Sequence, residues 1–132
     1  MPIRADRSSS IRFLRLESPN QLGNRLVSQR VTIGGVVLEP DSYLTLCIGA
    51  ANRDGREFPD PERFDIARRP NRHLAFAAGA HACAGMGVAR LEAQIALLRT
   101  VQRLPRLRLT GSATRARRAR FRGFLSLPAE VT

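Results

Sequence analysis

The pattern of apolar and polar residues begins with short extended segments. Two β-branched runs, Val31–Ile33 and Val36–Leu38, are separated by two glycines. Glycine takes positive φ without strain, so this spacing predicts a β-hairpin. The run 43–48 is almost continuously apolar and predicts a strand buried on both faces, in which Cys47 would be a small core residue.

One long amphipathic helix is predicted over about residues 84–104, ended by Pro105. Its apolar positions recur at helical spacing and form one stripe. The stripe consists of Val88, Leu91, Ile95, Leu98 and Val101. A much shorter helical segment is expected over 11–16, before Pro19.

The segment between the predicted strand and the long helix is irregular. Residues 58–64 mix rings and prolines, which favours extended, non-repetitive backbone. We expect a packed meander there, held by Phe58 and Phe64. After the long helix, residues 107–109 and 124–127 predict two short strands that close a sheet, with an arginine-rich loop between them.

Together these elements predict an α+β fold. We expect one domain over residues 11–132, with a small mixed sheet built from the hairpin and the strand 43–48. Residues 1–10 contain three consecutive serines and no apolar periodicity, so a disordered N-terminus is expected there.

Charge narrows the class of partner. The 132 residues include 22 basic side chains, all of them arginine, against 11 acidic ones, which gives a net charge of +11. Guanidinium groups bind carboxylates and phosphates, so the surface suits a carboxylate-bearing cofactor, an acidic redox protein or, less well, nucleic acid. The arginines at 115, 117, 118, 120 and 122 come without a recognition motif and with little aromatic interleaving, so nucleic acid is the least favoured partner.

The distribution of apolar residues argues against a membrane. No apolar run reaches the roughly 18 residues that a span requires. The first ten residues also lack the apolar middle of a secretory signal. We therefore expect a cytoplasmic protein without a membrane partner.

The segment 76–85 carries the candidate chemistry. It places one thiol, Cys83, among residues with almost no side chain and directly before the long helix. The N–H groups and partial positive charge at a helix N-terminus favour a thiolate, which is a suitable ligand for haem iron. From the residues alone, a lone cysteine with a histidine two positions before it is more often structural than a metal ligand or a nucleophile. The pattern by itself leaves both interpretations open.

The order of residues in this segment resembles the haem-loop signature of the cytochrome P450 family. Phe76, Gly79, His81, Cys83 and Gly85 stand at the five fixed positions of Phe-x-x-Gly-x-His/Arg-x-Cys-x-Gly. The resemblance to bacterial members covers about residues 14–128, and includes the segments 50–54 (AANRD), 58–65 (FPDPERFD), 73–76 (HLAF) and 122–128 (RGFLSLP).

This resemblance implies a cofactor and its ligands. Haem (iron protoporphyrin IX) would be bound with Cys83 as the iron ligand. The other implied haem contacts are Phe76 beside the thiolate, Gly79 and Gly85 where the backbone approaches the porphyrin, Arg25 and His81 at the propionates and, more weakly, His73.

The resemblance also has two breaks. Most helices of a complete member, including the one that activates oxygen, precede the region that this chain resembles. In the Glu-x-x-Arg motif, Arg15 matches the arginine, but Arg12 stands where the glutamate belongs and would repel it. We therefore expect a truncated haem-thiolate oxidoreductase of the monooxygenase family that lacks the distal half. Alone it would be inactive or limited to peroxide-driven, unselective oxidation.

Two kinds of partner follow from this interpretation. The resemblance implies an acidic electron donor such as a ferredoxin, near Arg90 and Arg99. The apolar surface that a partial fold exposes predicts a homodimer or a partner chain that covers it. The alternative function is a non-catalytic remnant or adaptor module that keeps the sheet and the long helix as a protein-binding surface.

Overall fold

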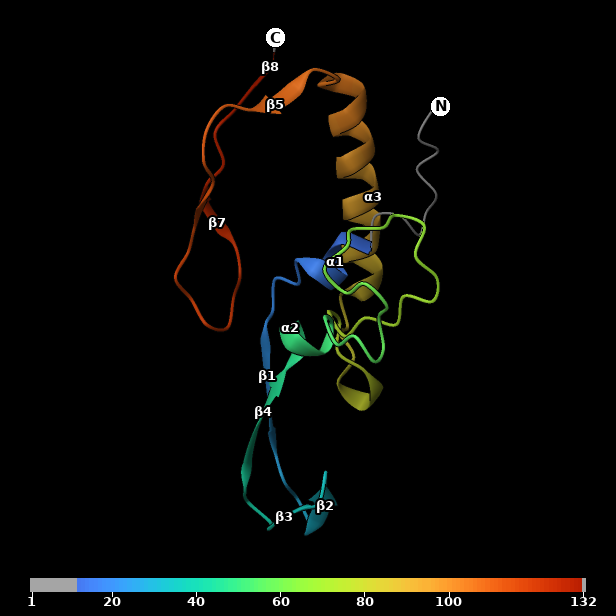
Figure 1. Ribbon diagram of the computed structural model, residues 1–132, viewed down its shortest axis with the longest axis vertical. Helices are drawn as coiled ribbons and strands as arrows, with labels where there is room; N and C mark the ends of the chain where they lie inside the picture. The colour runs from blue at the N-terminus through green and yellow to red at the C-terminus, as the bar shows by residue number, and fades with distance from the viewer. Residues whose placement is uncertain (1–11, 132) are drawn as a thin grey trace.

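The computed structural model describes residues 12–131. Figure 1 shows an elongated molecule in which the long helix α3 (Met86–Arg103) runs along one end and a narrow β ribbon points toward the other. The C-terminal strands form an arm beside α3, and the short helices and the meander lie between helix and ribbon. The disorder expected over residues 1–10 falls outside the described residues.

The ribbon pairs two strands that lie far apart in sequence. Strand β1 (Leu22–Leu26) is antiparallel to β4 (Tyr43–Cys47). The expected hairpin is confirmed, because β2 (Val31–Ile33) pairs with β3 (Val36–Leu38), but it forms a two-stranded sheet of its own. The expected single sheet of hairpin plus the 43–48 strand was therefore wrong. The sequence did not predict β1, because glycine, asparagine and arginine occupy the centre of its sequence LGNRL.

Strand β4 is not buried on both faces as expected. Tyr43 is 71% exposed and Cys47 is exposed, so the prediction of Cys47 as a core residue was also wrong. The reason is that β4 pairs with β1 alone, and no other helix or strand of the described residues makes extensive contact with it. A run of apolar residues usually indicates a buried strand, but most side chains of β4 are exposed.

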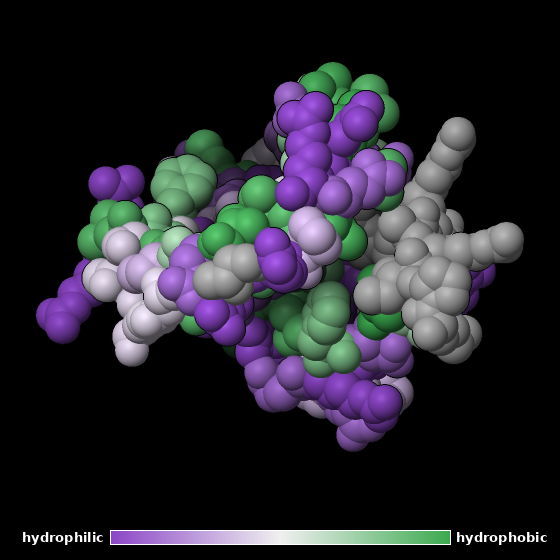
Figure 2. Space-filling view, turned by 90° about the horizontal axis from the view of Figure 1, so that it is seen from above, coloured by the Kyte–Doolittle hydropathy of each residue, from purple (hydrophilic) through white to green (hydrophobic). Residues whose placement is uncertain are grey.

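Both predicted helices are confirmed. Helix α1 (Arg12–Leu16) is the expected short segment, α2 (Ile48–Ala51) follows β4 directly, and α3 begins two residues after the predicted start. None of the side chains of α3 is buried. The five residues of its apolar stripe are between 46% and 66% exposed, and Figure 2 shows hydrophobic groups at the surface between polar ones. The expectation that a partial fold would expose apolar surface is confirmed.

The C-terminal strands close two small sheets instead of one. Strand β5 (Leu107–Leu109) pairs with β8 (Ala129–Val131), and β6 (Thr114–Arg115) pairs with β7 (Phe124–Ser126). All pairings are antiparallel, so the described residues form an α+β fold without a mixed sheet. The arginine-rich loop is the connection between β6 and β7.

The core is small and partly polar. Its buried apolar side chains are Val27, Ile48 and Phe58, and its buried polar ones are Arg12, Arg15, Ser18 and Asn52. Phe58 anchors the meander as expected, whereas Phe64 is 57% exposed and does not. The meander is held mainly by a buried cation, described below.

Candidate functional site

The loop that contains Cys83 has a defined backbone shape. The N–H of Cys83 donates to the carbonyl oxygen of Phe76 at 2.8 Å, which closes the loop at both ends. Inside it, the 3-10 turn η2 (Gly79–His81) is followed by a bond of 3.0 Å from the N–H of Ala82 to the oxygen of Gly79. The N–H of Met86, at the start of α3, donates to the carbonyl oxygen of Cys83 at 3.1 Å. The thiol residue therefore sits three positions before the helix, as the sequence indicated.

The surroundings of the Cys83 thiol are open. Cys83 is exposed and forms no disulfide. Gly79 adopts φ +67°, a conformation that glycine takes without strain, and a Cβ atom there would meet nothing within 4 Å. At Gly85, the nearest atom to such a Cβ would be the Sγ of Cys83 at 3.9 Å. Glycine and alanine around the sulfur thus leave room for a large planar group to approach.

Phe76 is the largest side chain of the loop and has a cation against its ring. The guanidinium carbon of Arg90, from α3, lies 5.7 Å from the ring centroid. The Nε atom of Arg90 is buried and has no hydrogen-bond partner within residues 12–131. Arg90 is therefore half-buried against the Phe76 ring, which makes it a poorer docking residue than was expected, while Arg99 is exposed.

His73 lies three residues before Phe76, at which the loop begins. Its ring is tilted by 48° to that of Phe76, with the centroids 6.0 Å apart. Its Nδ1 accepts a hydrogen bond of 3.2 Å from the N–H of Ala75, which requires that nitrogen to be unprotonated. Burial lowers the pKa of His73, and the positive charges of Arg90 and Arg15 lower it further. These contacts describe a neutral, partly buried histidine.

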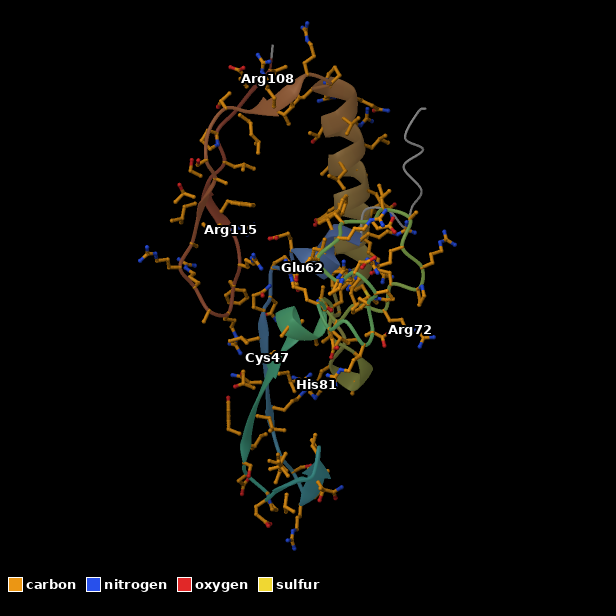
Figure 3. The ribbon with its side chains drawn as sticks, in the orientation of Figure 1. Cys47, Glu62, Arg72, His81, Arg108 and Arg115 are labelled. Carbon is orange, nitrogen blue, oxygen red and sulfur yellow. The ribbon has the colours of Figure 1, made fainter. Side chains whose placement is uncertain are left out.

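The two residues expected at the propionates lie on different elements. His81 is exposed at the end of η2, and Arg25 is half-buried in β1, where its Nη1 donates to the carbonyl oxygen of Asn24 at 2.8 Å. No hydrogen bond or ion pair within residues 12–131 joins Arg25, His81 and Cys83 to one another. Figure 3 shows His81 beside the short turn, well away from Arg108 and Arg115 on the C-terminal strands.

Two buried polar residues that the sequence did not predict, Arg15 and Asn52, connect the short helices to the meander and to Leu74. Arg15 donates from Nη1 to the carbonyl oxygens of Asn52 (2.9 Å) and Pro61 (2.7 Å), and from Nη2 to that of Arg63 (3.1 Å). The side-chain oxygen of Asn52 accepts the N–H of Leu74 at 2.7 Å. The sequence Asn-Arg-Asp-Gly had indicated a turn but gave no sign of a contact 22 residues away.

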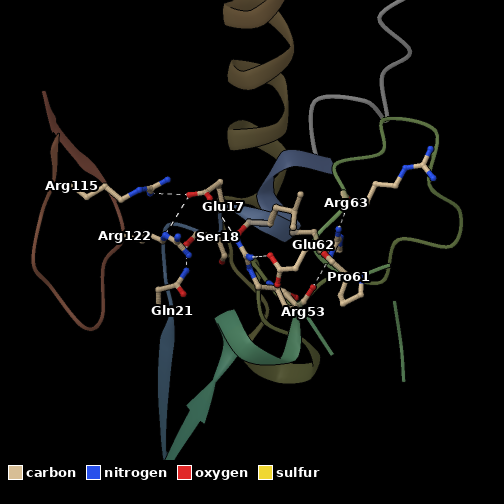
Figure 4. A network of polar contacts seen from close by, with 12 residues as sticks. Glu17, Ser18, Gln21, Arg53, Pro61, Glu62, Arg63, Arg115 and Arg122 are labelled. Atoms are coloured by element: carbon tan, nitrogen blue, oxygen red, sulfur yellow. Dashed lines mark hydrogen bonds and ion pairs between the residues drawn. The ribbon is translucent and has the colours of Figure 1, made fainter. Parts of the chain in front are cut away.

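A second polar cluster joins the N-terminal segment to the C-terminal arm (Figure 4). Glu17 lies 3.0 Å from Arg115, 3.5 Å from Arg122 and 3.7 Å from Arg53. Arg53 also pairs with Glu62 in the meander and donates to the carbonyl oxygen of Leu16 at 2.8 Å. Glu17, which directly follows α1, thus connects this helix to the C-terminal segment through its ion pairs with Arg115 and Arg122.

Among residues 12–131, no three side chains of His, Cys, Asp or Glu are gathered closely enough to hold a metal ion. In the same part of the chain, no helix combines the length and apolar character that a membrane span requires.

A protein-family model described as Cytochrome P450 matches residues 13–128. The chain belongs to the cytochrome P450 family. It is 48% identical over 96 residues to a biotin biosynthesis cytochrome P450 of Bacillus subtilis, which covers 73% of this chain and 24% of the relative. It is 42% identical over 118 residues to a putative cytochrome P450 140 of Mycobacterium tuberculosis, which covers 88% of this chain and 27% of the relative.

Solved P450 structures share the fold closely. P450BioI, in complex with an acyl carrier protein ligated to hexadec-9Z-enoic acid, superposes with a TM-score of 0.91 at 39% identity, covering 98% of this chain and 34% of that chain. CYP109E1 from Bacillus megaterium in complex with testosterone superposes with a TM-score of 0.86 at 33% identity, covering 93% of this chain and 34% of that chain. This P450 chain therefore spans about a quarter to a third of the length of the relatives it matches.

The residues present fit a haem held by a thiolate, the ligation known for P450s. Cys83 offers an exposed sulfur in a loop of fixed backbone shape, and the neighbouring glycines leave open space beside it. The break in the Glu-x-x-Arg motif does not leave Arg15 unsatisfied, because three backbone carbonyls bind its guanidinium. Arg12 is buried on the same short helix.

Proposed function

We propose that this P450 chain binds haem through the thiolate of Cys83 and contributes the proximal side of a haem-thiolate monooxygenase. The observation that carries the proposal is the Cys83 loop. It has an exposed free thiol, a backbone closed from Phe76 to Cys83, and α3 beginning directly after it. When bound, haem would supply the oxygen chemistry, and the protein would supply its ligand, orientation and shielding.

The other candidate residues would act around that ligand. Phe76 would cover the thiolate on one side, while Gly79 and Gly85 would let the backbone approach the porphyrin. Arg25, half-buried on β1, and His81, exposed at the end of η2, would bind the propionates, because guanidinium and imidazolium N–H groups donate charge-assisted hydrogen bonds to carboxylates. His73, whose Nδ1 accepts the N–H of Ala75, would be the weakest of the haem contacts.

The 132 residues supply the proximal contact, and the distal, oxygen-activating side would come from residues outside them. An acidic electron donor of the ferredoxin type remains the proposed redox partner, with Arg99 a candidate contact because it is exposed on α3. Arg90 is withdrawn from that role by its packing against Phe76.

A hemin titration of the purified chain tests the ligation. The expected result is a complex whose reduced carbon monoxide spectrum has the red-shifted band of a thiolate ligand. Cys83→Ala should abolish that band. Cys47→Ala is the matched control, because Cys47 is also a free, exposed cysteine and should leave the band unchanged.

Two outcomes would overturn the proposal. The first is hemin uptake without sulfur-to-iron coordination, and the second is an unchanged spectrum in Cys83→Ala. Failure to take up hemin at all would favour the second candidate function, a non-catalytic module. The observation behind that candidate is the exposed apolar stripe of α3, which suits a protein-binding surface.

A further inference from the structure

The Cys83 loop is held at its entry by a side chain from another part of the fold. Two backbone hydrogen bonds, both of 2.8 Å, shape the loop: the N–H of Ala77 donates to the oxygen of Leu74, and the N–H of Cys83 donates to the oxygen of Phe76. Just before it, the N–H of Leu74 donates to Oδ1 of Asn52 at 2.7 Å. That bond connects the loop entry to the end of α2.

Asn52 is itself firmly placed. Its side chain and backbone are fully buried, with 0% of the residue exposed. Its N–H donates to the carbonyl oxygen of Ile48 at 3.0 Å, which ends α2, and its own carbonyl oxygen accepts the guanidinium of Arg15 at 2.9 Å. A loop anchored to Asn52 is therefore anchored to both α1 and α2.

Only one of the two polar atoms of the Asn52 side-chain amide forms a hydrogen bond. Its Nδ2 is buried and has no hydrogen-bond partner among the described residues. A buried donor without a partner lowers stability, and an apolar side chain of similar size would avoid that cost. What an apolar side chain would lose is the acceptor for Leu74, so the bond made by Oδ1 accounts for an amide at this position.

We propose that Asn52 is a positioning residue for Cys83. By holding the N–H of Leu74, it fixes where the loop starts, and the bonds from Leu74 to Ala77 and from Phe76 to Cys83 carry that placement to the thiol. Asn52 itself makes no contact with the sulfur. The inference deepens the proposed function and rests on it for its consequence at the haem, whereas the effect on the loop backbone is independent of haem.

Amide hydrogen exchange of the haem-free chain tests the backbone effect. Asn52→Leu removes the acceptor, and we expect at least tenfold faster exchange at the amides of Leu74 and Cys83. Asn52→Asp keeps an acceptor in place and should retain most of the protection. Asn24→Leu, at a half-buried asparagine of β1, is the matched control and should leave both amides unchanged.

Folding of each variant is checked by far-UV circular dichroism. If Asn52→Leu does not fold, Asn52→Ser replaces it, because a serine hydroxyl is too short to reach Leu74. Unchanged protection of the Cys83 amide in a folded variant that lacks the acceptor would overturn the inference, as would equal deprotection in Asn52→Asp.

A hemin titration then reads the consequence at the thiol. The fraction of bound hemin with the thiolate spectrum should fall in Asn52→Leu and recover in Asn52→Asp. If the wild-type chain shows no thiolate ligation, the proposed function fails, but the exchange experiment still decides whether Asn52 controls the loop. The two failures are therefore distinguishable.

Discussion

Arg15 on α1 donates a hydrogen bond of 2.9 Å to the carbonyl oxygen of Asn52, 37 residues further along the chain. The same guanidinium lies over the ring of Phe58, 5.1 Å from its centroid, and binds two carbonyl oxygens of the meander. Burial is the main cause that lowers the pKa of Arg15, with the charges of Arg68 and Arg53 adding to it. One buried cation thus joins α1, α2 and the meander.

Replacing that cation should be costly. Arg15 is 2% exposed, and Arg15→Ala would leave three carbonyl oxygens without their donor and a void beside Phe58. We expect the free energy of unfolding to fall by about 3 kcal/mol, measured by urea denaturation. Arg30→Ala is the control, because the side chains of Arg30 and its partner Glu39 are 70% and 62% exposed. It should cost less than about 1 kcal/mol, and similar losses in the two variants would contradict this assignment.

The backbone of the Cys83 loop contains one strained alanine. Ala77 adopts φ +56°, a left-handed conformation that a Cβ atom disfavours. Ala77→Gly should therefore raise the free energy of unfolding by about 1 kcal/mol. Ala78, which has φ −153° and is extended, provides the control. Ala78→Gly should lower stability, because it only adds freedom to the unfolded chain. Thermal unfolding of the two variants should shift in opposite directions, and a shift in the same direction would argue against strain at Ala77.

His73 should make stability depend on pH. Because burial and two arginines lower the pKa of His73 below its usual 6.5, the folded state binds fewer protons than the unfolded state as the pH falls through that value. The contribution of neutral His73 is complete above about pH 6.5 and is lost progressively below it. Urea denaturation between pH 8 and pH 5 should show this decline.

Two substitutions assign the decline to His73. His73→Asn keeps an acceptor for the N–H of Ala75 but cannot titrate, so its stability should vary less over this range. His81→Asn removes an exposed histidine of the same loop region and should preserve the wild-type decline. An identical pH profile in His73→Asn would show that another group is responsible.

The parts of this fold that sequence could predict are those with local causes. The glycines between two β-branched runs specified the β2–β3 hairpin, and helical spacing from Val88 to Val101 specified α3. The five fixed positions around Cys83 indicated the family, which the match over residues 13–128 confirms.

The parts that sequence could not predict depend on distant contacts. Strand β1 exists because β4 pairs with it, although its centre has few strand-forming residues. Arg15 and Asn52 meet 37 residues apart, and no periodicity signals a guanidinium that binds backbone carbonyls. The exposure of β4 and Cys47 was mispredicted for the same reason, because the covering layer that an apolar run suggests is not part of the described residues.

The uncovered apolar surface should cause the 132-residue chain to associate. The chain exposes 10131 Å², whereas a compact monomer of 14.6 kDa exposes roughly 6,900 Å². The excess, roughly 3,000 Å² on one chain, is at least as large as the roughly 1,000–2,500 Å² that each partner buries in an obligate interface.

On α3, the apolar stripe includes Ile95, which is 52% exposed. At micromolar concentration we expect dimers or larger species by sedimentation velocity. Ile95→Lys should shift them toward monomer, because a charge within the apolar contact must be desolvated. Thr100→Lys adds the same charge at an exposed position of α3 outside the stripe and should leave the distribution unchanged. A wild-type chain that sediments as a stable, monodisperse monomer would mean that this surface is tolerated in water, and the stripe would then have no role in association.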